Sequence, residues 1–165
     1  MDYMAIPPKL VGDVYLNLRT RPIRVGNYVN EDGVQQGYSG DFYSDSKEIT
    51  WEQVAQEAGM PENEAVKLAE RERTTVTKRI RRVATFSFIG LKDAVRTNGA
   101  TKLVVNFIQY INWKDAGLNG GIEALRKLSK ESRAFLDKVE EVAQVPIVLI
   151  GTGAMHHEMI NLLGD

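Results

Sequence analysis

Two short, largely apolar runs, residues 102–108 and 146–150, constrain the fold of this chain most strongly. Each has the length of a strand, and neither shows the apolar–polar alternation of a strand with one face in water. Between them, Ser129 begins a helical pattern whose apolar residues recur on one face up to residue 142. Buried strands that alternate with helices are typical of a parallel sheet. We therefore predict an α/β fold with a mostly parallel sheet and flanking helices.

Helix-capping signals place three further helices. Thr50 and Gln53 have the spacing of a capping box, and Gly59 ends the short helix that the box begins. Pro61 is a favourable first residue for a second helix. The third helix lies within residues 87–99, begins after a serine cap and ends at an Asn-Gly pair.

The ends of the chain and the segment 25–46 carry less regular patterns. Between residues 11 and 18 the apolar residues fit both a helical and an alternating spacing, so a helix and a strand both remain open. Segment 25–46 is rich in Gly, Ser, Asp, Asn and Tyr, which predicts a long loop. A last helix is predicted to run to Leu163. The length of 165 residues suits one compact domain.

Composition and charge exclude several classes of protein. The net charge is −1 at pH 7, so no overall field would recruit nucleic acid or an anionic membrane. The chain contains no cysteine, which excludes disulfides and thiolate metal sites. Its apolar runs fall short of the ~20 residues that span a bilayer, and residues 1–8 do not have the pattern of a secretory signal. We expect a cytoplasmic protein without a membrane partner.

A cluster of arginines is the first candidate site. If residues 77–82 are extended, Arg79 and Arg81 point to the same face, with Thr77 beside them. Two guanidinium groups on one face suit a dicarboxylate or a phosphate, because each can pair with two oxygens at once. A solvated basic edge strand explains the same spacing, and spacing alone favours that explanation.

A Gly-Thr-Gly turn and a histidine pair form two further candidates. Gly151, Thr152 and Gly153 follow a predicted buried strand, at the edge of an α/β sheet where ligands bind, although an ordinary turn has the same sequence. His156 and His157 are adjacent, and consecutive residues of a helix diverge by about 100°. We interpret them as surface residues and predict no metal site.

Residues 50–69 also permit a different class of function. Two predicted helices with a glycine between them, followed by basic residues, are similar to a helix-turn-helix. Glu62, Glu64 and Glu70 on the second helix would repel phosphates, so nucleic acid is not the expected partner. Two ordinary packed helices are the favoured interpretation.

Four segments, in this order, resemble the C-terminal part of the adenylosuccinate synthetase family. They are IPPKLVGDVYLNLRTRPIRVG (6–26), TVTKRIRR (75–82), LKDAVRTNGATKLVV (91–105) and VPIVLIGTG (145–153). The resemblance implies a P-loop-like α/β fold. In it, segment 1–26 carries the acceptor-nucleotide residues, and segment 27–73 is a loop followed by two helices. Segment 74–165 carries the aspartate loop and the donor-base region. The phosphate loop and the catalytic residues of the family belong to an N-terminal half, so no catalytic residue is expected in this chain.

The resemblance also implies a role for particular residues. Thr77, Arg79 and Arg81 match the residues that bind L-aspartate, with Lys78 in place of the family's glycine. Val25 and Gly26, together with Arg79, match the residues at the acceptor nucleotide. Purine nucleotides, L-aspartate and the N-terminal half of a synthetase are then the expected partners, with Mg²⁺ held mainly by phosphates and a homodimer as the complete enzyme. The isolated chain is expected to be inactive.

The chain departs from the family at the donor base. The family strand ends Thr-Lys-Leu-Asp, where the aspartate binds guanine N1 and N2, whereas residues 106–109 are Asn-Phe-Ile-Gln here. A glutamine amide offers one donor and one acceptor, which suits the adenine edge. Asn106, Gln109, Thr152 and Gly153 are therefore expected at the base of an adenine nucleotide. This favours the phage branch of the family, which joins L-aspartate to dGMP in the host cytoplasm; an ordinary synthetase using IMP and GTP remains the alternative.

Overall fold

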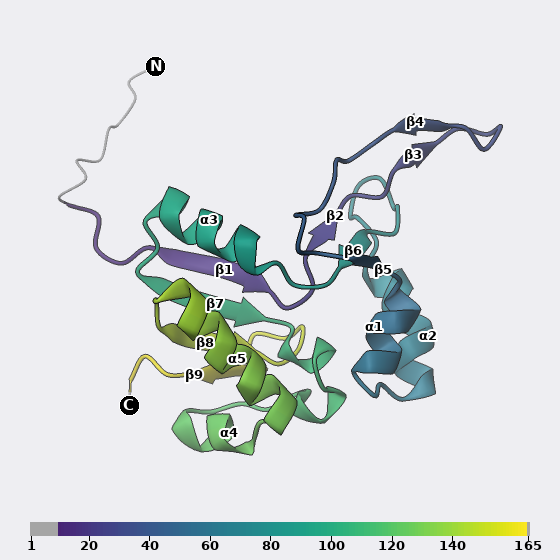
Figure 1. Ribbon diagram of the computed structural model, residues 1–165. Coiled ribbons are helices and arrows are strands. Elements are labelled where there is room, and N and C mark those ends of the chain that lie inside the picture. Colours follow the sequence, from purple (N-terminus) through teal and green to yellow (C-terminus); the bar gives the residue numbers. More distant parts are fainter. Residues whose placement is uncertain (1–9, 165) are drawn as a thin grey trace.

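The computed structural model describes residues 10–164, and its largest element is a four-stranded sheet (Figure 1). The strand order is β1 (Tyr15–Arg19), β7 (Lys102–Asn106), β8 (Ile147–Gly151) and β9 (Met159–Asn161). The first three strands are parallel, and β9 is antiparallel to β8. Residues 1–9, which include the Pro7–Pro8 pair and the start of the first motif, lie outside the described residues. The predicted α/β fold with a mostly parallel sheet is confirmed.

Helices cover one face of this sheet and close its core. Helices α3 (Phe88–Asn98) and α5 (Lys130–Ala143) lie over the strands, and the short α4 (Ile122–Lys127) packs beside β9 (Figure 1). Ser87 and Ser129 cap α3 and α5 as predicted, and each side chain accepts a hydrogen bond from the backbone three residues later. Six fully buried apolar side chains lie at the centre of the core: Leu103, Val105, Ile108, Val139, Ile150 and Ile160.

A second, smaller group of elements packs at the end of the sheet. Strands β2 (Ile23–Arg24), β6 (Arg82–Ala84) and β5 (Glu48–Ile49) form an antiparallel sheet next to helices α1 (Trp51–Glu57) and α2 (Glu62–Arg71). The capping box predicted at Thr50 is present. The buried residues of this group include Tyr110, which comes from the main sheet region. Both predicted helices of the helix-turn-helix alternative therefore exist, and they pack against each other as an ordinary pair.

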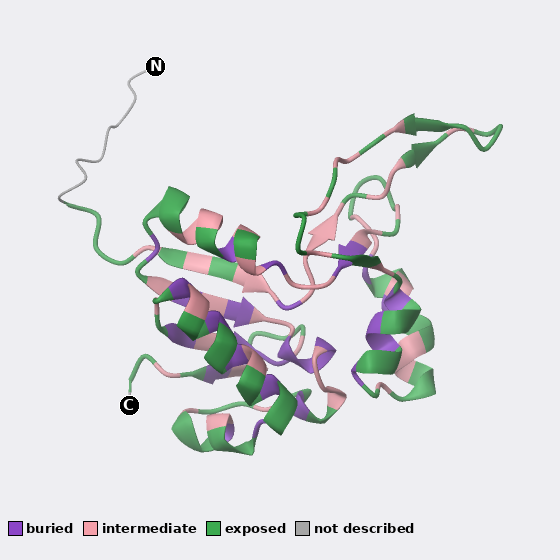
Figure 2. Cartoon of the chain, viewed as in Figure 1, coloured by how far each residue is buried: buried purple, intermediate pink, exposed green. Residues whose placement is uncertain are grey.

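A hairpin interrupts the predicted long loop. Strands β3 (Tyr28–Val29) and β4 (Gln35–Gly37) pair antiparallel and project away from the body of the molecule (Figure 1). The Asn30 side chain accepts a hydrogen bond from the Val34 backbone N–H across the turn, at 2.8 Å. Much of the hairpin is exposed (Figure 2). Segment 25–46 is otherwise without regular structure, as its composition predicts.

The predicted last helix is wrong. Residues 152–158 form turns, and Met159–Asn161 is strand β9. The Thr152 backbone N–H donates to the Glu158 carbonyl at 2.9 Å, which reverses the chain so that β9 pairs with β8. This pairing satisfies an edge of β8 that would otherwise lie unpaired, and it buries Ile160 completely. Pairing with β8 has overridden the local helical pattern.

The structure also decides the conformation of segment 15–19 and shortens the strand predicted at residues 102–108. The segment 15–19 is a strand rather than a helix. The apolar run at 102–108 ends as a strand at Asn106, after which Ile108–Tyr110 forms the 3-10 helix η2. Within the described residues, none of the helices is long and apolar enough to cross a bilayer.

Candidate functional site

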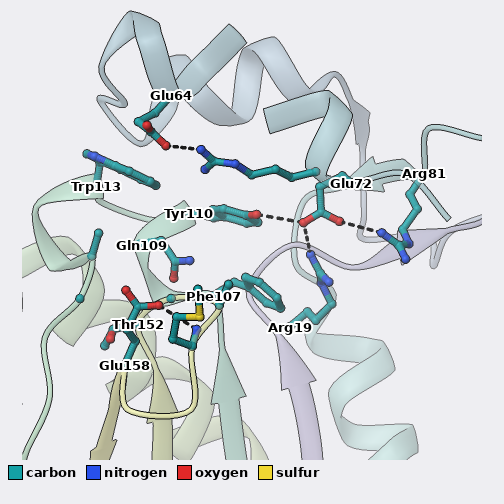
Figure 3. A pocket seen from close by; sticks show the side chains of 16 residues that line it. Arg19, Glu64, Glu72, Arg81, Phe107, Gln109, Tyr110, Trp113, Thr152 and Glu158 are labelled. Atoms are coloured by element: carbon teal, nitrogen blue, oxygen red, sulfur yellow. Dashed lines mark hydrogen bonds and ion pairs between the residues drawn. The ribbon is translucent and has the colours of Figure 1, made fainter. Parts of the chain in front are cut away.

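The candidate site is a pocket of about 730 Å³ at the carboxyl ends of the parallel strands (Figure 3). Its walls come from the end of β1, from η2 after β7, from the loop after β8 and from α2. Ligands of open α/β sheets bind at this edge, because the loops that follow parallel strands meet there. The pocket brings together Arg81, Gln109, Thr152 and Gly153 from the residues predicted by sequence.

An unusual backbone turn places Gln109 in this pocket. Phe107, directly after β7, adopts a left-handed conformation with φ of 64°. The buried Thr20 hydroxyl donates to the Phe107 carbonyl at 2.6 Å, and the Thr20 N–H donates to the Asn106 carbonyl at 3.1 Å. These bonds hold a conformation that is unfavourable for a residue other than glycine. The turn ends β7 and starts η2, which carries Gln109.

The Gln109 side chain is buried, and its carbonyl oxygen has no hydrogen-bond partner among the described residues. Gln109 is 5% exposed, and Oε1 accepts no hydrogen bond within residues 10–164. In Figure 3 this side chain points into the space between the Tyr110 turn and the loop that carries Thr152 and Glu158. Leaving a buried acceptor unpaired costs about 1–3 kcal/mol. The site can therefore accept a hydrogen bond from a ligand N–H or O–H group.

Thr152 and Gly153 shape the wall opposite Gln109. All three polar groups of Thr152 are satisfied internally: its N–H by Glu158, its carbonyl by Gly117, and its hydroxyl by the Leu118 carbonyl at 2.6 Å. Thr152 can therefore contribute contact surface rather than a hydrogen bond. A Cβ on Gly153 would meet the Glu158 carboxylate, so a side chain at position 153 would displace this carboxylate from the pocket wall.

Asn106 lies outside the residues that line the pocket. Its Nδ2 donates to Asn17 Oδ1 at 2.5 Å, across the paired strands β7 and β1. Its Oδ1 occupies the space that a Cβ on Gly151 would need, at 2.4 Å. Within the described residues, the polar contact of the Asn106 side chain is therefore with β1.

A buried carboxylate, Glu72, connects three walls of the pocket (Figure 3). Its Oε1 accepts hydrogen bonds from Arg19 Nη2 at 2.8 Å and from the Tyr110 hydroxyl at 2.9 Å. Its Oε2 accepts one from Arg81 Nη1 at 3.4 Å. Burial, and then the charge of Glu72, raises the pKa of the Tyr110 hydroxyl well above its usual value. Tyr110 is therefore a neutral hydrogen-bond donor here.

The remaining predicted site residues lie beside the pocket rather than in it. Arg79 stacks over the Tyr28 ring with 4.6 Å between its guanidinium carbon and the ring centre. A Cβ on Gly26 would meet the Ile80 carbonyl oxygen, so the Val25–Gly26 segment touches residues 74–82, here called the arginine loop. Thr77 hydrogen-bonds to the Thr74 hydroxyl within this loop. The structure thus brings Val25, Gly26 and Arg79 close together, while Arg81 reaches the pocket.

The arginine loop is not extended throughout. Thr77 lies in a turn, and Lys78 is left-handed with φ of 55°. The Lys78 N–H donates to the Thr74 carbonyl at 3.1 Å, and its carbonyl accepts from Arg73 Nη1 at 2.8 Å. From Arg79 onward the chain extends into β6. Lys78 therefore adopts a backbone conformation that glycine, the family's residue at this position, takes freely.

Substitutions at Lys78 should report this strain. We expect Lys78→Gly to change the free energy of unfolding by less than about 0.5 kcal/mol, because relief of left-handed strain is offset by the greater freedom of glycine in the unfolded chain. Lys78→Val should destabilise by about 1–2 kcal/mol, because a β-branched residue tolerates this conformation poorly. Urea unfolding of both variants measures this. Equal stability of the two would mean that residue 78 has a negative φ in solution.

No group of three or more His, Asp or Glu side chains is placed to hold a metal ion among residues 10–164. His156 and His157 are exposed and contact each other edge to face, with ring centres 5.2 Å apart. They lie in a turn rather than in the helix that was predicted for them.

Several pocket residues carry no recognisable signal in the sequence. Arg19, Glu72, Tyr110 and Trp113 come from separate segments, and each lines the pocket. Glu72 stands between two arginines in the sequence, so local pattern suggests only a surface ion pair. Arg19 is a basic residue at the end of an apolar run. Because strand ends face the edge of the sheet where ligands bind, this position was the one local signal in the sequence for a residue of the pocket.

Comparisons with known proteins identify relatives of two kinds. The N6-succino-2-amino-2'-deoxyadenylate synthase of Salmonella phage PMBT28 is 38% identical over 106 residues, which cover 64% of this chain and 26% of the relative. The adenylosuccinate synthetase of Methanocaldococcus jannaschii is 30% identical over 162 residues, which cover 98% of this chain and 38% of the relative. No family model matches the chain. The chain thus spans about a quarter to two fifths of these relatives' length.

Solved structures agree with the sequence relatives. The succinoaminodeoxyadenylate synthetase PurZ of cyanophage S-2L, bound to dGMP and dATP, matches 90% of this chain and 33% of its own with a TM-score of 0.59 and 27% identity. The adenylosuccinate synthetase of Plasmodium falciparum matches 96% of this chain with a TM-score of 0.65; at 16% identity it supports the fold alone. The chain is a homologue of part of the adenylosuccinate synthetases and of their phage counterparts, which confirms the resemblance predicted from its motifs.

Proposed function

We propose that this chain is the C-terminal portion of a synthetase that ligates L-aspartate to a 6-oxopurine nucleotide, and that its pocket binds the adenine of the phosphate donor. The observation that carries the proposal is the buried Gln109 amide, whose Oε1 has no partner within residues 10–164. Adenine offers an N6–H₂ donor beside an N1 acceptor. Gln109 Oε1 accepts from N6–H₂, and the Gln109 amide nitrogen donates to N1.

Guanine fits the same side chain less well. Its edge presents the O6 acceptor beside donors at N1 and N2. A single amide can donate to O6 and accept from N1–H, which leaves the N2–H₂ donor unpaired. An unpaired donor in a closed site is costly. Thr152 and Gly153 would pack against the face of the base, since the Thr152 hydroxyl is already bonded to Leu118. Asn106 supports this site from β7 through Asn17 without contacting the base.

The proposed reaction has two steps. The purine loses its N1 proton to a base proposed in the N-terminal half, and its O6 attacks the γ-phosphorus of the donor. The bond to the β–γ bridging oxygen breaks and releases the nucleoside diphosphate. The aspartate amine then adds at purine C6 and displaces phosphate, losing a proton as the new C–N bond forms. Arg81 and Arg79 pair with the aspartate carboxylates, beside Thr77. When bound, Mg²⁺ neutralises phosphate charge, and residues 10–164 offer no ligand cluster for it.

The favoured acceptor is dGMP. Phage synthases named for the succino-2-amino-2'-deoxyadenylate product are 34–38% identical to this chain, and PurZ was solved with dGMP and dATP. Val25 and Gly26 would approach the acceptor ribose, next to Arg79. The alternative, IMP with GTP, is supported by the Methanocaldococcus jannaschii relative, which aligns with 98% of this chain. In either case we propose the N-terminal half of the synthetase as the partner of this chain, a homodimer as the complete enzyme, and the cytoplasm as its location.

Phosphate release tests the proposal. The 165-residue chain alone should release no phosphate from ATP or GTP when mixed with dGMP or IMP, L-aspartate and Mg²⁺, because the groups that bind the β- and γ-phosphates are proposed to lie in the other half. The complete protein should release phosphate only when aspartate and dGMP are both present. Steady turnover by the chain alone, or aspartate-independent turnover by the complete protein, would contradict the proposal.

A further inference from the structure

The Glu72 carboxylate contacts groups from three segments that are far apart in the sequence. Arg19 ends β1, Tyr110 lies in η2, and Arg81 precedes β6. The Glu72 side chain is 5% exposed, whereas those of Arg19 and Arg81 are 23% and 24% exposed. A buried carboxylate between two arginines is well compensated in charge, and losing it leaves both guanidinium groups without their counter-ion.

Arg81 keeps most of its hydrogen-bonding capacity free. Within the described residues its side chain makes one polar contact, the 3.4 Å bond to Glu72 Oε2. A guanidinium carries five N–H donors, so the contact with Glu72 engages one of them and leaves the others for a ligand carboxylate. The other acids near the pocket are engaged elsewhere: Glu64 pairs with Arg71 at 2.5 Å, and Glu158 accepts from the Met155 N–H at 2.8 Å.

The same carboxylate is tied to the turn that carries Gln109. Tyr110, the next residue, donates to Glu72 at 2.9 Å and stacks on Phe107 with ring centres 5.3 Å apart. The Arg19 guanidinium lies 4.0 Å from the Phe107 ring centre and pairs with Glu72 at 2.8 Å. Glu72, Tyr110, Phe107 and Arg19 therefore form a closed ring of contacts. A shift of η2 when a base contacts Gln109 would reach Glu72 through this ring.

We infer that Glu72 is a positioning residue that orients Arg81 for the L-aspartate carboxylate and couples this orientation to occupancy of the donor-base site. The inference rests on the proposed function. Glu72 acts through Arg81 and Tyr110, so its removal should alter aspartate binding selectively. Because coupling is reciprocal, a bound donor should tighten aspartate binding as well.

The test compares variants of the complete synthetase. Glu72→Gln should raise KM for L-aspartate about tenfold, within the range for residues in direct contact, and change KM for ATP and dGMP less than about twofold. In the wild-type enzyme, saturating ATP should lower the aspartate KM by about fivefold, a typical coupling. Tyr110→Phe keeps the carboxylate but removes its link to η2, so it should abolish most of this fivefold effect. The matched control is Glu48→Gln, whose carboxylate pairs with the neighbouring Arg82 at 2.6 Å, away from the pocket; it should leave the aspartate KM unchanged.

Each outcome decides the inference. Equal increases in all three KM values for Glu72→Gln, or none, would overturn it, because a structural role does not select aspartate. If Glu72→Gln does not fold, the donor dependence of the aspartate KM in Tyr110→Phe decides alone, and an unchanged fivefold effect would overturn the inference. A complete protein with no aspartate-dependent phosphate release would overturn the proposed function and this inference with it. Normal release with unselective variants would overturn this inference only.

Discussion

Replacement of Arg81 by leucine in the complete synthetase should raise KM for L-aspartate by about thirty- to a thousandfold. A charge-assisted bidentate pair in a closed site contributes about 2–4 kcal/mol, which corresponds to this range. Arg81 lines the pocket and is held by Glu72, with its other donors free of polar contacts within residues 10–164. Initial-rate kinetics with each substrate varied in turn measure the effect. KM for the donor nucleotide should change far less.

Arg79 and an exposed arginine complete this comparison. Arg79 lies beside Gly26, so Arg79→Leu should raise KM for aspartate and also for the acceptor nucleotide. Arg96 on α3 has a side chain that is 83% exposed, and Arg96→Leu should leave all three KM values unchanged. Small and equal effects of the Arg79 and Arg81 substitutions on all substrates would instead support a solvated basic edge strand.

The parts of the fold that are determined by residues close together in the sequence could be predicted from the sequence. The caps at Thr50, Ser87 and Ser129 were located because each side chain bonds to the backbone within three residues. Strands β7 and β8 were located because each lies in a largely apolar run of the sequence. Strand β9 was missed because its pairing with β8 is a property of the folded sheet, which no local periodicity encodes.

The candidate site was only partly predictable for the same reason. Gln109, Thr152, Gly153 and Arg81 were found through motifs, and they meet in the pocket. Glu72 was missed, since its three partners lie 9 to 53 residues away in the sequence. The family's glycine at position 78 left the backbone shape of Lys78 open, and the left-handed conformation there depends on hydrogen bonds from the loop around it.

Replacement of Gln109 by aspartate should reverse the preference for the donor base. The carboxylate offers two acceptors, which suit guanine N1–H and N2–H₂, and it faces adenine N1 with a repelling charge. We expect kcat/KM for ATP to fall about 10–100-fold and some use of GTP to appear, the usual scale for one polar discrimination. Asp lacks one methylene of Gln, so recovery of GTP use should be partial. Gln109→Glu, which keeps the length, is the control for charge alone.

Donor competition in the complete protein is the most direct test that this pocket binds an adenine base through Gln109. ATP or dATP and GTP compete in one reaction with dGMP and L-aspartate, and the ADP, dADP and GDP formed are separated and counted. We predict that the adenine donors exceed GTP by about 10–100-fold in kcat/KM and that Gln109→Asp removes this advantage. A preference for GTP that Gln109→Asp does not change would contradict binding of adenine through Gln109.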